Sequence, residues 1–347
     1  MNFLIVGLGG IGQRHLRNLY RFKKREDNIF VIRNRGNQYV LNDNLQIVGD
    51  NLEEKYQVRR LDSFAEALAN KIDAAFICTP TAFHTEMLAK CIKHGISVFV
   101  EKPISNLLEH LDDIAKESVE NNITTFIGYQ MRYHPCIKRA KQLLSDGQIG
   151  YPISVIAEVG EDVTSWHTYE DYKTLYACRK ELGGGVILTQ IHEIDYLHYL
   201  FGFPKKLFAI GGHISDLEID VEDVVDLSMY FQISEVNHNI PVHLHQDFIQ
   251  KPGCRTCKII GNTGKIVIDF SFSSIQLYDK YGKCVYDENY QFDRNELFLA
   301  EIKEFIDAVK EHRQTAIPIA EGIISLKIAL AAQESLKTGR VIEFESL

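Results

Sequence analysis

The sequence predicts an α/β domain with a doubly wound parallel sheet, followed by an α+β domain with a mostly antiparallel, open sheet. Three observations support this fold class. Short apolar runs alternate with helical patterns over residues 1–122, longer alternating runs occupy 123–295, and helical patterns return over 296–347. The chain, with 347 residues, is long enough for two cores. We therefore place domain boundaries at these changes and expect the last helices to pack back on the first domain.

Strands and helices alternate through the first domain. Four apolar runs have the length and composition of buried strands: 2–6, 29–32, 74–78 and 97–100. Helical patterns lie between them, over 11–22, 64–69 and 81–94. Ser63 with Glu66 forms a capping box before the second helix, and Gly95 is suited to end the third. Strands separated by helices in this way form parallel sheets.

Strand patterns dominate the second domain. Seven runs are candidates for its strands: 124–128, 153–159, 207–211, 224–233, 242–248, 258–260 and 265–270. The Gly-Asn-Thr-Gly sequence at 261–264 is typical of a turn between the last two. One long helix is expected over 184–201, and the tail is expected to be helical over 296–311 and 320–338.

Composition excludes several classes of protein. A net charge of -9 and a pI near 5.8 leave no broad basic face for nucleic acid. No apolar stretch approaches the roughly 18 residues of a membrane span, and residues 1–6 lead directly into a strand without an export signal. Seven cysteines lack a disulfide framework, and Cys254 with Cys257 has no second metal-binding pair. We expect a cytoplasmic protein without a metal and without a nucleic-acid or membrane partner.

A glycine-rich turn follows the first strand. Its sequence is Gly7-Leu8-Gly9-Gly10-Ile11-Gly12, which satisfies G-x-G-x-x-G between a strand and a helix. Glycines at these positions permit a tight turn and let the backbone approach a pyrophosphate, whose charge lies at the amino end of the helix. This turn predicts a Rossmann domain that binds a dinucleotide, with a merely glycine-rich turn as the alternative.

The end of the second strand predicts the form of that dinucleotide. The sequence there is Ile32-Arg33-Asn34-Arg35, where NAD-binding proteins usually have an acid for the ribose 2′-hydroxyl. Because basic residues accommodate a 2′-phosphate, we predict NADP(H) as cofactor, with Arg33 as its ligand. NAD stays possible, since these arginines could equally form a solvated loop.

Two further motifs lie at the carboxyl ends of predicted strands, where open α/β sheets bind their ligands. They are Cys78-Thr79-Pro80 with His84, and Glu101-Lys102-Pro103. The residues of these motifs that are predicted to bind the cofactor are Thr79, Pro80, His84, Glu101 and Lys102. Lys102 beside a nicotinamide could also stabilise charge on a substrate oxygen, although a surface lysine in a turn fits the spacing equally well.

Five motifs together resemble the Gfo/Idh/MocA family of oxidoreductases over essentially the whole chain. They are the Gly7-to-His15 run, Cys78-Thr79-Pro80 with His84, Glu101-Lys102-Pro103, the stretch Gln130 to Pro135, and Gly183-Gly184-Gly185. The resemblance implies a Rossmann domain and a second domain whose open sheet packs against a partner subunit, as a homo-dimer or homo-tetramer. It also implies an enzyme, an NAD(P)-dependent dehydrogenase or reductase acting on CH-OH groups.

The resemblance assigns catalytic roles to two residues. The family's lysine contacts the nicotinamide ribose and the substrate hydroxyl, which corresponds to Lys102, and its helical histidine acts as acid/base, which corresponds to His192. The sequence departs from the family where Thr189 replaces the usual aspartate and His192 follows after three residues, not four. A hydrogen-bonded structural histidine is the alternative for His192. We predict these substrate-binding residues: Lys102, Arg132, Tyr133, Trp166, Thr189 and His192.

The segment over 161–181 is expected to cover the active site. It carries Trp166 and several tyrosines, whose faces suit a sugar, and basic residues that suit phosphate. A lid or interface loop packed by its own tyrosines is the alternative. The predicted substrate is therefore a sugar or nucleotide sugar, in a role such as surface-polysaccharide sugar biosynthesis. Alternatives are an inositol or free-sugar dehydrogenase, and a regulatory protein that binds NAD(P) without turnover.

Overall fold

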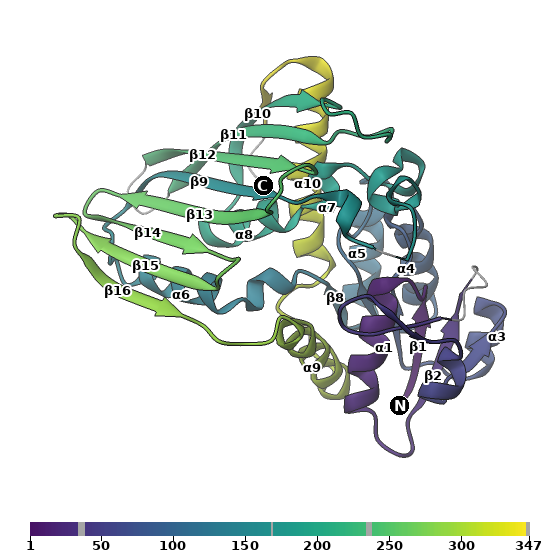
Figure 1. Cartoon of the computed structure of the whole chain (residues 1–347). Helices are drawn as coiled ribbons and strands as arrows, with labels where there is room; N and C mark the ends of the chain where they lie inside the picture. Colours follow the sequence, from purple (N-terminus) through teal and green to yellow (C-terminus); the bar gives the residue numbers. More distant parts are fainter. Residues whose placement is uncertain (34–38, 168, 234–237, 345–347) are drawn as a thin grey trace.

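A computed structural model of the chain describes residues 1–33, 39–167, 169–233 and 238–344. Figure 1 shows two lobes, each built around its own sheet, with the helix α10 (Ile319–Thr338) running between them. The described residues contain no helix that is long and apolar enough to cross a membrane. Asn34 and Arg35, which belong to the motif after the second strand, lie outside the described residues.

The first lobe contains a six-stranded, wholly parallel sheet. Its strands lie in the order β5 (Arg59–Leu61), β2 (Asn28–Ile32), β1 (Asn2–Val6), β6 (Ala74–Ile77), β7 (Ser97–Val100) and β8 (Thr125–Ile127). The accompanying helices are α1 (Gly10–Phe22), α2 (Leu52–Tyr56), α3 (Phe64–Ala69), α4 (His84–Lys93) and α5 (Leu111–Glu120). This is the expected Rossmann arrangement, except that the 124–128 run, expected in the second domain, forms β8 at the edge of this sheet because it pairs in parallel with β7. The strand order reverses between β1 and β6, so a ligand crevice belongs at their carboxyl ends.

Local signals that were predicted for this lobe are present. The Ser63 hydroxyl accepts a hydrogen bond from the amide of Glu66 and caps α3. Gly95 follows α4 with φ +71°, a conformation that glycine adopts without strain. A small two-stranded sheet of β3 (Val40–Leu41) and β4 (Ile47–Gly49) lies outside the main one and had no clear sequence signal.

The second lobe contains a nine-stranded sheet whose strand pairs are antiparallel except for one. The order is β16 (Cys284–Asn289), β15 (Ser274–Asp279), β14 (Gly264–Asp269), β13 (Cys254–Gly261), β9 (Pro152–Gly160), β12 (His238–Asp247), β11 (Val224–Ile233), β10 (Pro204–Gly212) and β17 (Ile342–Glu343). β9 and β12 are the parallel pair. In β11, buried Leu227 and Met229 alternate with exposed Ser228 and Tyr230, so only one face of the sheet is covered.

Helices join the two lobes. Helices α6 (Pro135–Ser145) and α8 (His192–Phe201) pack against the large sheet. Helix α9 (Asn295–Glu311) contacts α1, and α10 contacts β8 and α5 of the first lobe as well as β10 of the second (Figure 1). Each of these last two helices therefore fixes how the crevice of the first lobe faces the second.

The prediction of one long helix over 184–201 is wrong, because the structure divides this range into α7 (Val186–Thr189) and α8. Two carbonyl oxygens at the break accept side-chain hydrogen bonds from distant residues. The Thr189 oxygen accepts from Nζ of Lys102 at 2.6 Å, and the Gln190 oxygen accepts from the amide of Gln246 at 2.9 Å. These donors offer the backbone an alternative to the continuous helical ladder.

Candidate functional site

The glycine turn lies between β1 and α1, at the centre of the first sheet. A Cβ on Gly7 would lie 2.7 Å from the Cys78 carbonyl oxygen, and one on Gly12 would lie 2.0 Å from the Gly7 carbonyl oxygen. Both positions therefore require glycine. A Cβ on Gly9 would meet nothing within 4 Å, which leaves open space beside the turn. The first intrahelical bond of α1 runs from Gln13 to Gly9, so the preceding amides have no helical acceptor and fit a pyrophosphate.

His84 ties together the turns that follow β6 and β7. Its Nε2 lies 2.8 Å from the Thr79 carbonyl oxygen, and its Nδ1 lies 2.8 Å from the Pro103 carbonyl oxygen. Burial lowers the pKa of His84 despite these two acceptors. The Thr79 hydroxyl is buried and has no hydrogen-bond partner among the described residues, which suits a polar ligand at this edge. Pro80 lies half-buried in the same turn.

Lys102 reaches from the first lobe to the second. Its Nζ donates to the Thr189 carbonyl oxygen at 2.6 Å, and its amide donates to Oε2 of Glu101. The other oxygen of Glu101 lies 2.5 Å from Nε2 of His15, a buried residue of α1. The predicted Glu101-Lys102 motif is therefore fixed on one side by the glycine-turn helix and on the other by α7. An ammonium group has three N–H bonds, so two remain to bind a substrate oxygen.

His192 is a buried histidine at the start of α8. Its Nε2 lies 3.0 Å from the side-chain amide nitrogen, Nε2, of Gln130, which is in the 3-10 helix η2 (Gln130–Tyr133). Its Nδ1 has no hydrogen-bond partner among the described residues, and neither has the Thr189 hydroxyl. Burial, together with the positive charges of Lys102 and Arg255, holds the pKa of His192 well below its usual 6.5. The imidazole is therefore neutral at neutral pH and has one nitrogen available for a ligand.

The acids that follow His192 are paired inside the second lobe. Glu193 accepts a bidentate hydrogen bond from Arg255, at 2.7 and 3.0 Å. Asp195 accepts a bidentate hydrogen bond from Arg132, at 2.9 and 2.7 Å. These carboxylates are bound to arginines and have no contact with Lys102. Of these polar side chains at the start of α8, His192 is the one that is not paired with an arginine, and the charge of Lys102 contributes to its lowered pKa.

Arg132 and Tyr133, expected at the substrate, direct their polar atoms to carboxylates of the fold. Besides Asp195, the Arg132 guanidinium donates to Glu321 of α10 at 2.8 Å. The Tyr133 hydroxyl donates to Glu304 of α9. Both residues connect η2 to the carboxyl-terminal helices, and the structure does not bring their polar groups to Lys102 or His192.

Arg33 lies at the end of β2 and is buried. Its guanidinium forms an ion pair with Oε1 of Glu53 in α2, at 2.5 Å. A 2′-phosphate at this position would have to share Arg33 with a carboxylate.

The segment between β9 and α7 lies beside the glycine turn. A Cβ on Gly10 would lie 3.2 Å from the hydroxyl of Tyr169 and 3.1 Å from the side chain of Leu45. Trp166 packs its ring edge-to-face on Phe248, with 5.5 Å between the ring centres. The part of this segment nearest the first lobe thus approaches the glycine turn, while Trp166 is held by the core of the second lobe.

The Gly183-Gly184-Gly185 run brings the lobes together. A Cβ on Gly183 would lie 2.9 Å from Cβ of Thr81, in the turn that follows Thr79 and Pro80. A Cβ on Gly184 would lie 2.4 Å from a backbone oxygen of its own segment. Gly184 is required because backbone passes closely against it, and Gly183 and Gly185 have positive φ values of +78° and +106° that favour glycine.

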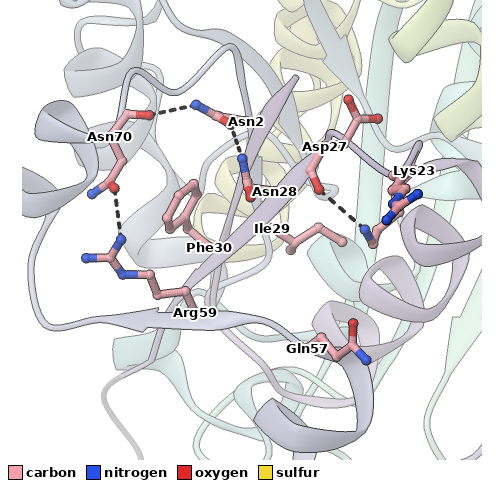
Figure 2. Close-up of a pocket in the computed structure, with 10 residues that line it drawn as sticks. Asn2, Lys23, Asp27, Asn28, Ile29, Phe30, Gln57, Arg59 and Asn70 are labelled. Atoms are coloured by element: carbon pink, nitrogen blue, oxygen red, sulfur yellow. Dashed lines mark hydrogen bonds between the residues drawn. The ribbon is translucent and has the colours of Figure 1, made fainter.

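A 460 Å³ cavity lies on the opposite side of the first lobe. Figure 2 shows its lining at the amino ends of β1 and β2, where Asn2, Asn28, Asn70 and Arg59 surround Phe30. Ligands of open α/β sheets bind at the carboxyl ends of strands, so this cavity takes no part in the candidate site.

The sequence analysis missed Gln130 as a partner of His192 and Glu53 as a partner of Arg33. Gln130 comes shortly after β8, and this position at a carboxyl strand end was a usable signal. No sequence pattern predicted that Glu53 would pair with Arg33, because the ion pair depends on how α2 packs beside the end of β2. Cys254 and Cys257 are free, and the described residues contain no group of ligands that could hold a metal ion.

Comparisons with protein families cover nearly the whole chain. Residues 1–129 match the model of an oxidoreductase family with an NAD-binding Rossmann fold, abbreviated Gfo/Idh/MocA. Residues 141–344 match the model of that family's carboxyl-terminal alpha/beta domain.

Individual relatives are similar over their full lengths. The chain is 26% identical to myo-inositol 2-dehydrogenase of Thermotoga maritima, over 100% of this chain and 99% of the relative. The fold is similar to myo-inositol 2-dehydrogenase of Lactobacillus plantarum, with a TM-score of 0.77, 22% identity and 99% of each chain covered. It is also similar to UDP-N-acetylglucosamine 3-dehydrogenase of Acidithiobacillus ferrooxidans, with a TM-score of 0.72, 20% identity, and 97% of this chain and 98% of that chain covered.

Proposed function

Because this chain belongs to the Gfo/Idh/MocA family of oxidoreductases with an NAD-binding Rossmann fold, we propose that it oxidises or reduces one ring carbon of a sugar or cyclic polyol. The observation that carries the proposal is the hydrogen bond from Nζ of Lys102, in the turn after β7, to the carbonyl oxygen of Thr189, three residues before His192. A nicotinamide bound there supplies the hydride chemistry at its C4 carbon. The side chains then have to manage the proton and the charge on the substrate oxygen.

Lys102 is proposed to orient and polarise that oxygen. Its Nζ is anchored by the Thr189 carbonyl at 2.6 Å, so its remaining N–H bonds point from a fixed position. An ammonium group held in this way stabilises an alkoxide or a carbonyl oxygen as negative charge develops. The Thr189 hydroxyl, buried and without a partner among the described residues, is proposed to bind the same or the neighbouring substrate hydroxyl.

His192 is proposed to take the proton during oxidation and return it during reduction. A neutral imidazole suits the first step, and the lowered pKa keeps His192 neutral at neutral pH. The contact with Gln130 involves Nε2 and leaves Nδ1 toward the substrate. Nδ1 can accept the substrate proton when the neutral imidazole carries its own proton on Nε2. Gln130 is a positioning residue in this scheme: its side-chain amide, whose nitrogen lies 3.0 Å from Nε2, must turn its oxygen toward Nε2–H to hold that tautomer.

The proposed cofactor is NADP(H), with Arg33 as the ligand of the 2′-phosphate. Arg33 lies where a Rossmann domain reads the ribose, and it already binds an anion there, the carboxylate of Glu53. For NADP(H) to bind, the phosphate must replace or outcompete Glu53. Glu53 is therefore proposed to limit the preference for NADP(H) over NAD(H).

The proposed substrate carries several hydroxyl groups on a ring. Relatives act on myo-inositol and on a UDP-sugar according to their names, so both free and nucleotide-linked rings belong in the test. Arg132 and Tyr133 are engaged by the fold, and we assign substrate binding to Lys102, Thr189, His192 and, at the edge, Trp166. The seven free cysteines support a role in the reducing cytoplasm.

Turnover assays on the unchanged chain and on the variant His192→Asn test the proposal. The purified chain is incubated with NAD or NADP and a panel of myo-inositol, scyllo-inositol, xylose and UDP-N-acetylglucosamine, and nicotinamide reduction is followed by absorbance. We expect turnover with at least one ring polyol and its loss in His192→Asn. A chain that binds the cofactor tightly but turns over no polyol or sugar in either direction would support a regulatory role instead.

A further inference from the structure

Two side chains of the second lobe lie over the glycine turn of the first. A Cβ on Gly10 would be 3.2 Å from the hydroxyl of Tyr169 and 3.8 Å from Nε2 of His167. Gly10 is the first residue of α1, the place where the pyrophosphate of a dinucleotide meets the helix amides. These two residues, which lie outside the five sequence motifs, therefore face the first turn of α1, where the pyrophosphate of a bound dinucleotide would lie.

The two side chains form an ordered ring pair. The rings of His167 and Tyr169 stack with 5.0 Å between their centres and an angle of 17°. Tyr39, which belongs to the first lobe, packs on Tyr169 with 5.4 Å between ring centres. The stack thus runs from the second lobe to the first across the outer edge of the glycine turn.

Hydrogen bonding fixes how His167 is oriented. Its Nδ1 lies 2.7 Å from Oε1 of Glu170, which favours a proton on Nδ1. The other ring nitrogen, Nε2, is the one that faces Gly10. An imidazolium has two N–H groups, so in that form His167 could donate one to the Glu170 carboxylate and the other to a phosphate oxygen next to Nε2.

We propose that His167 and Tyr169 are cofactor-binding residues that close the pyrophosphate site from the second lobe. His167 donates from Nε2 to a phosphate oxygen, and Tyr169 supports the imidazole by stacking and shields the phosphates from water. The inference rests on the proposed function, since it requires a pyrophosphate-containing dinucleotide at the glycine turn. It assigns to the segment between β9 and α7 a role in holding the cofactor.

Binding measurements on paired variants test this inference. Equilibrium titrations with NADPH, NADH and ADP are followed by fluorescence or calorimetry, because ADP carries the pyrophosphate without a nicotinamide. The variants are His167→Ala, Tyr169→Ala and Tyr169→Phe. The control is Tyr172→Phe, in the same segment. It removes a hydroxyl whose oxygen accepts a hydrogen bond from the backbone amide of Glu218, away from the glycine turn.

The expected result is a rise in Kd of at least about fivefold for all three ligands in His167→Ala and Tyr169→Ala. Tyr169→Phe keeps the ring and should retain most of the affinity, and Tyr172→Phe should bind like the unchanged chain. Equal or tighter binding by folded His167→Ala and Tyr169→Ala overturns the inference while leaving the proposed function intact. Failure of the unchanged chain to bind any of the three ligands overturns both.

Discussion

Nζ of Lys102 lies 2.6 Å from the carbonyl oxygen of Thr189, and this bond connects the parallel sheet of one lobe to the helix break of the other. The break after Thr189 begins α8 at His192. The same contact therefore positions both Lys102, proposed to polarise the substrate oxygen, and His192, proposed as the acid/base. A change on either side of it should alter catalysis more than stability.

The pH dependence of oxidation should report the lowered pKa of His192. Because the folded-state pKa lies well below 6.5, the neutral base persists as the pH falls through 6.5 and is lost only at lower pH. We expect the acidic limb of the kcat/KM profile to lie below pH 6.5 and to disappear, with a large loss of rate, in His192→Asn. An acidic limb above pH 7 that survives in His192→Asn would exclude this assignment.

Removing Arg132 should affect stability more than substrate binding. Arg132→Met leaves the buried carboxylate of Asp195 without its partner, which should destabilise the fold by about 3–5 kcal/mol. The measurement is thermal unfolding together with KM of the folded variant. An unchanged melting temperature with a greatly raised KM would instead support the substrate-binding role predicted from the sequence.

Replacing Glu53 should change cofactor preference. Glu53→Gln removes the carboxylate charge that pairs with Arg33, so a 2′-phosphate meets less competition from Glu53. The ratio of the Kd for NADH to the Kd for NADPH is expected to rise by about tenfold, equivalent to about 1.4 kcal/mol. The double variant Glu53→Gln with Arg33→Ala should lose this gain. An unchanged ratio would show that the 2′-phosphate of NADPH binds away from Arg33 and Glu53.

The uncovered face of the large sheet should form the subunit contact implied by the family resemblance. Ile156 is 42% exposed and shares that face with Ile210 and Tyr230 across the sheet register. Ile156→Lys is expected to lower the mass measured by sedimentation. The matched control is Val119→Lys, at a 66% exposed position on α5 of the first lobe. Equal masses for both variants and the unchanged chain would move the interface to another surface.

Local patterns explain why much of the fold could be predicted. Strands β1, β2, β6 and β7 of the first sheet are nearly continuous apolar runs, and the glycine turn, Ser63 and Gly95 act through their own backbone neighbours. Strands β15 and β16 were missed because their mixed sequences carry many polar residues and are only partly buried. Local patterning cannot identify a strand whose apolar face is this incomplete.

Long-range contacts explain what could not be predicted at the site. The end of α7 depends on Lys102 and Gln246, which lie 87 and 56 residues away from the carbonyls they bind. The partner of Arg33 depends on the fold of α2, and the approach of Tyr169 to Gly10 depends on how the lobes meet. Motifs were enough to propose Lys102 and His192 as site residues, whereas the hydrogen-bond partners of their side chains could not be predicted.

The most direct test of the central claim is the turnover of Lys102→Met with saturating cofactor and the best polyol of the panel. We predict that kcat falls by about 10²–10³, because the group that stabilises charge on the substrate oxygen is removed, while loss of the lysine's contact with the nicotinamide ribose raises the cofactor Kd by a smaller factor. Lys102→Arg should recover only part of the loss, since its planar group cannot reproduce the anchored ammonium. Full turnover by Lys102→Met would contradict the account.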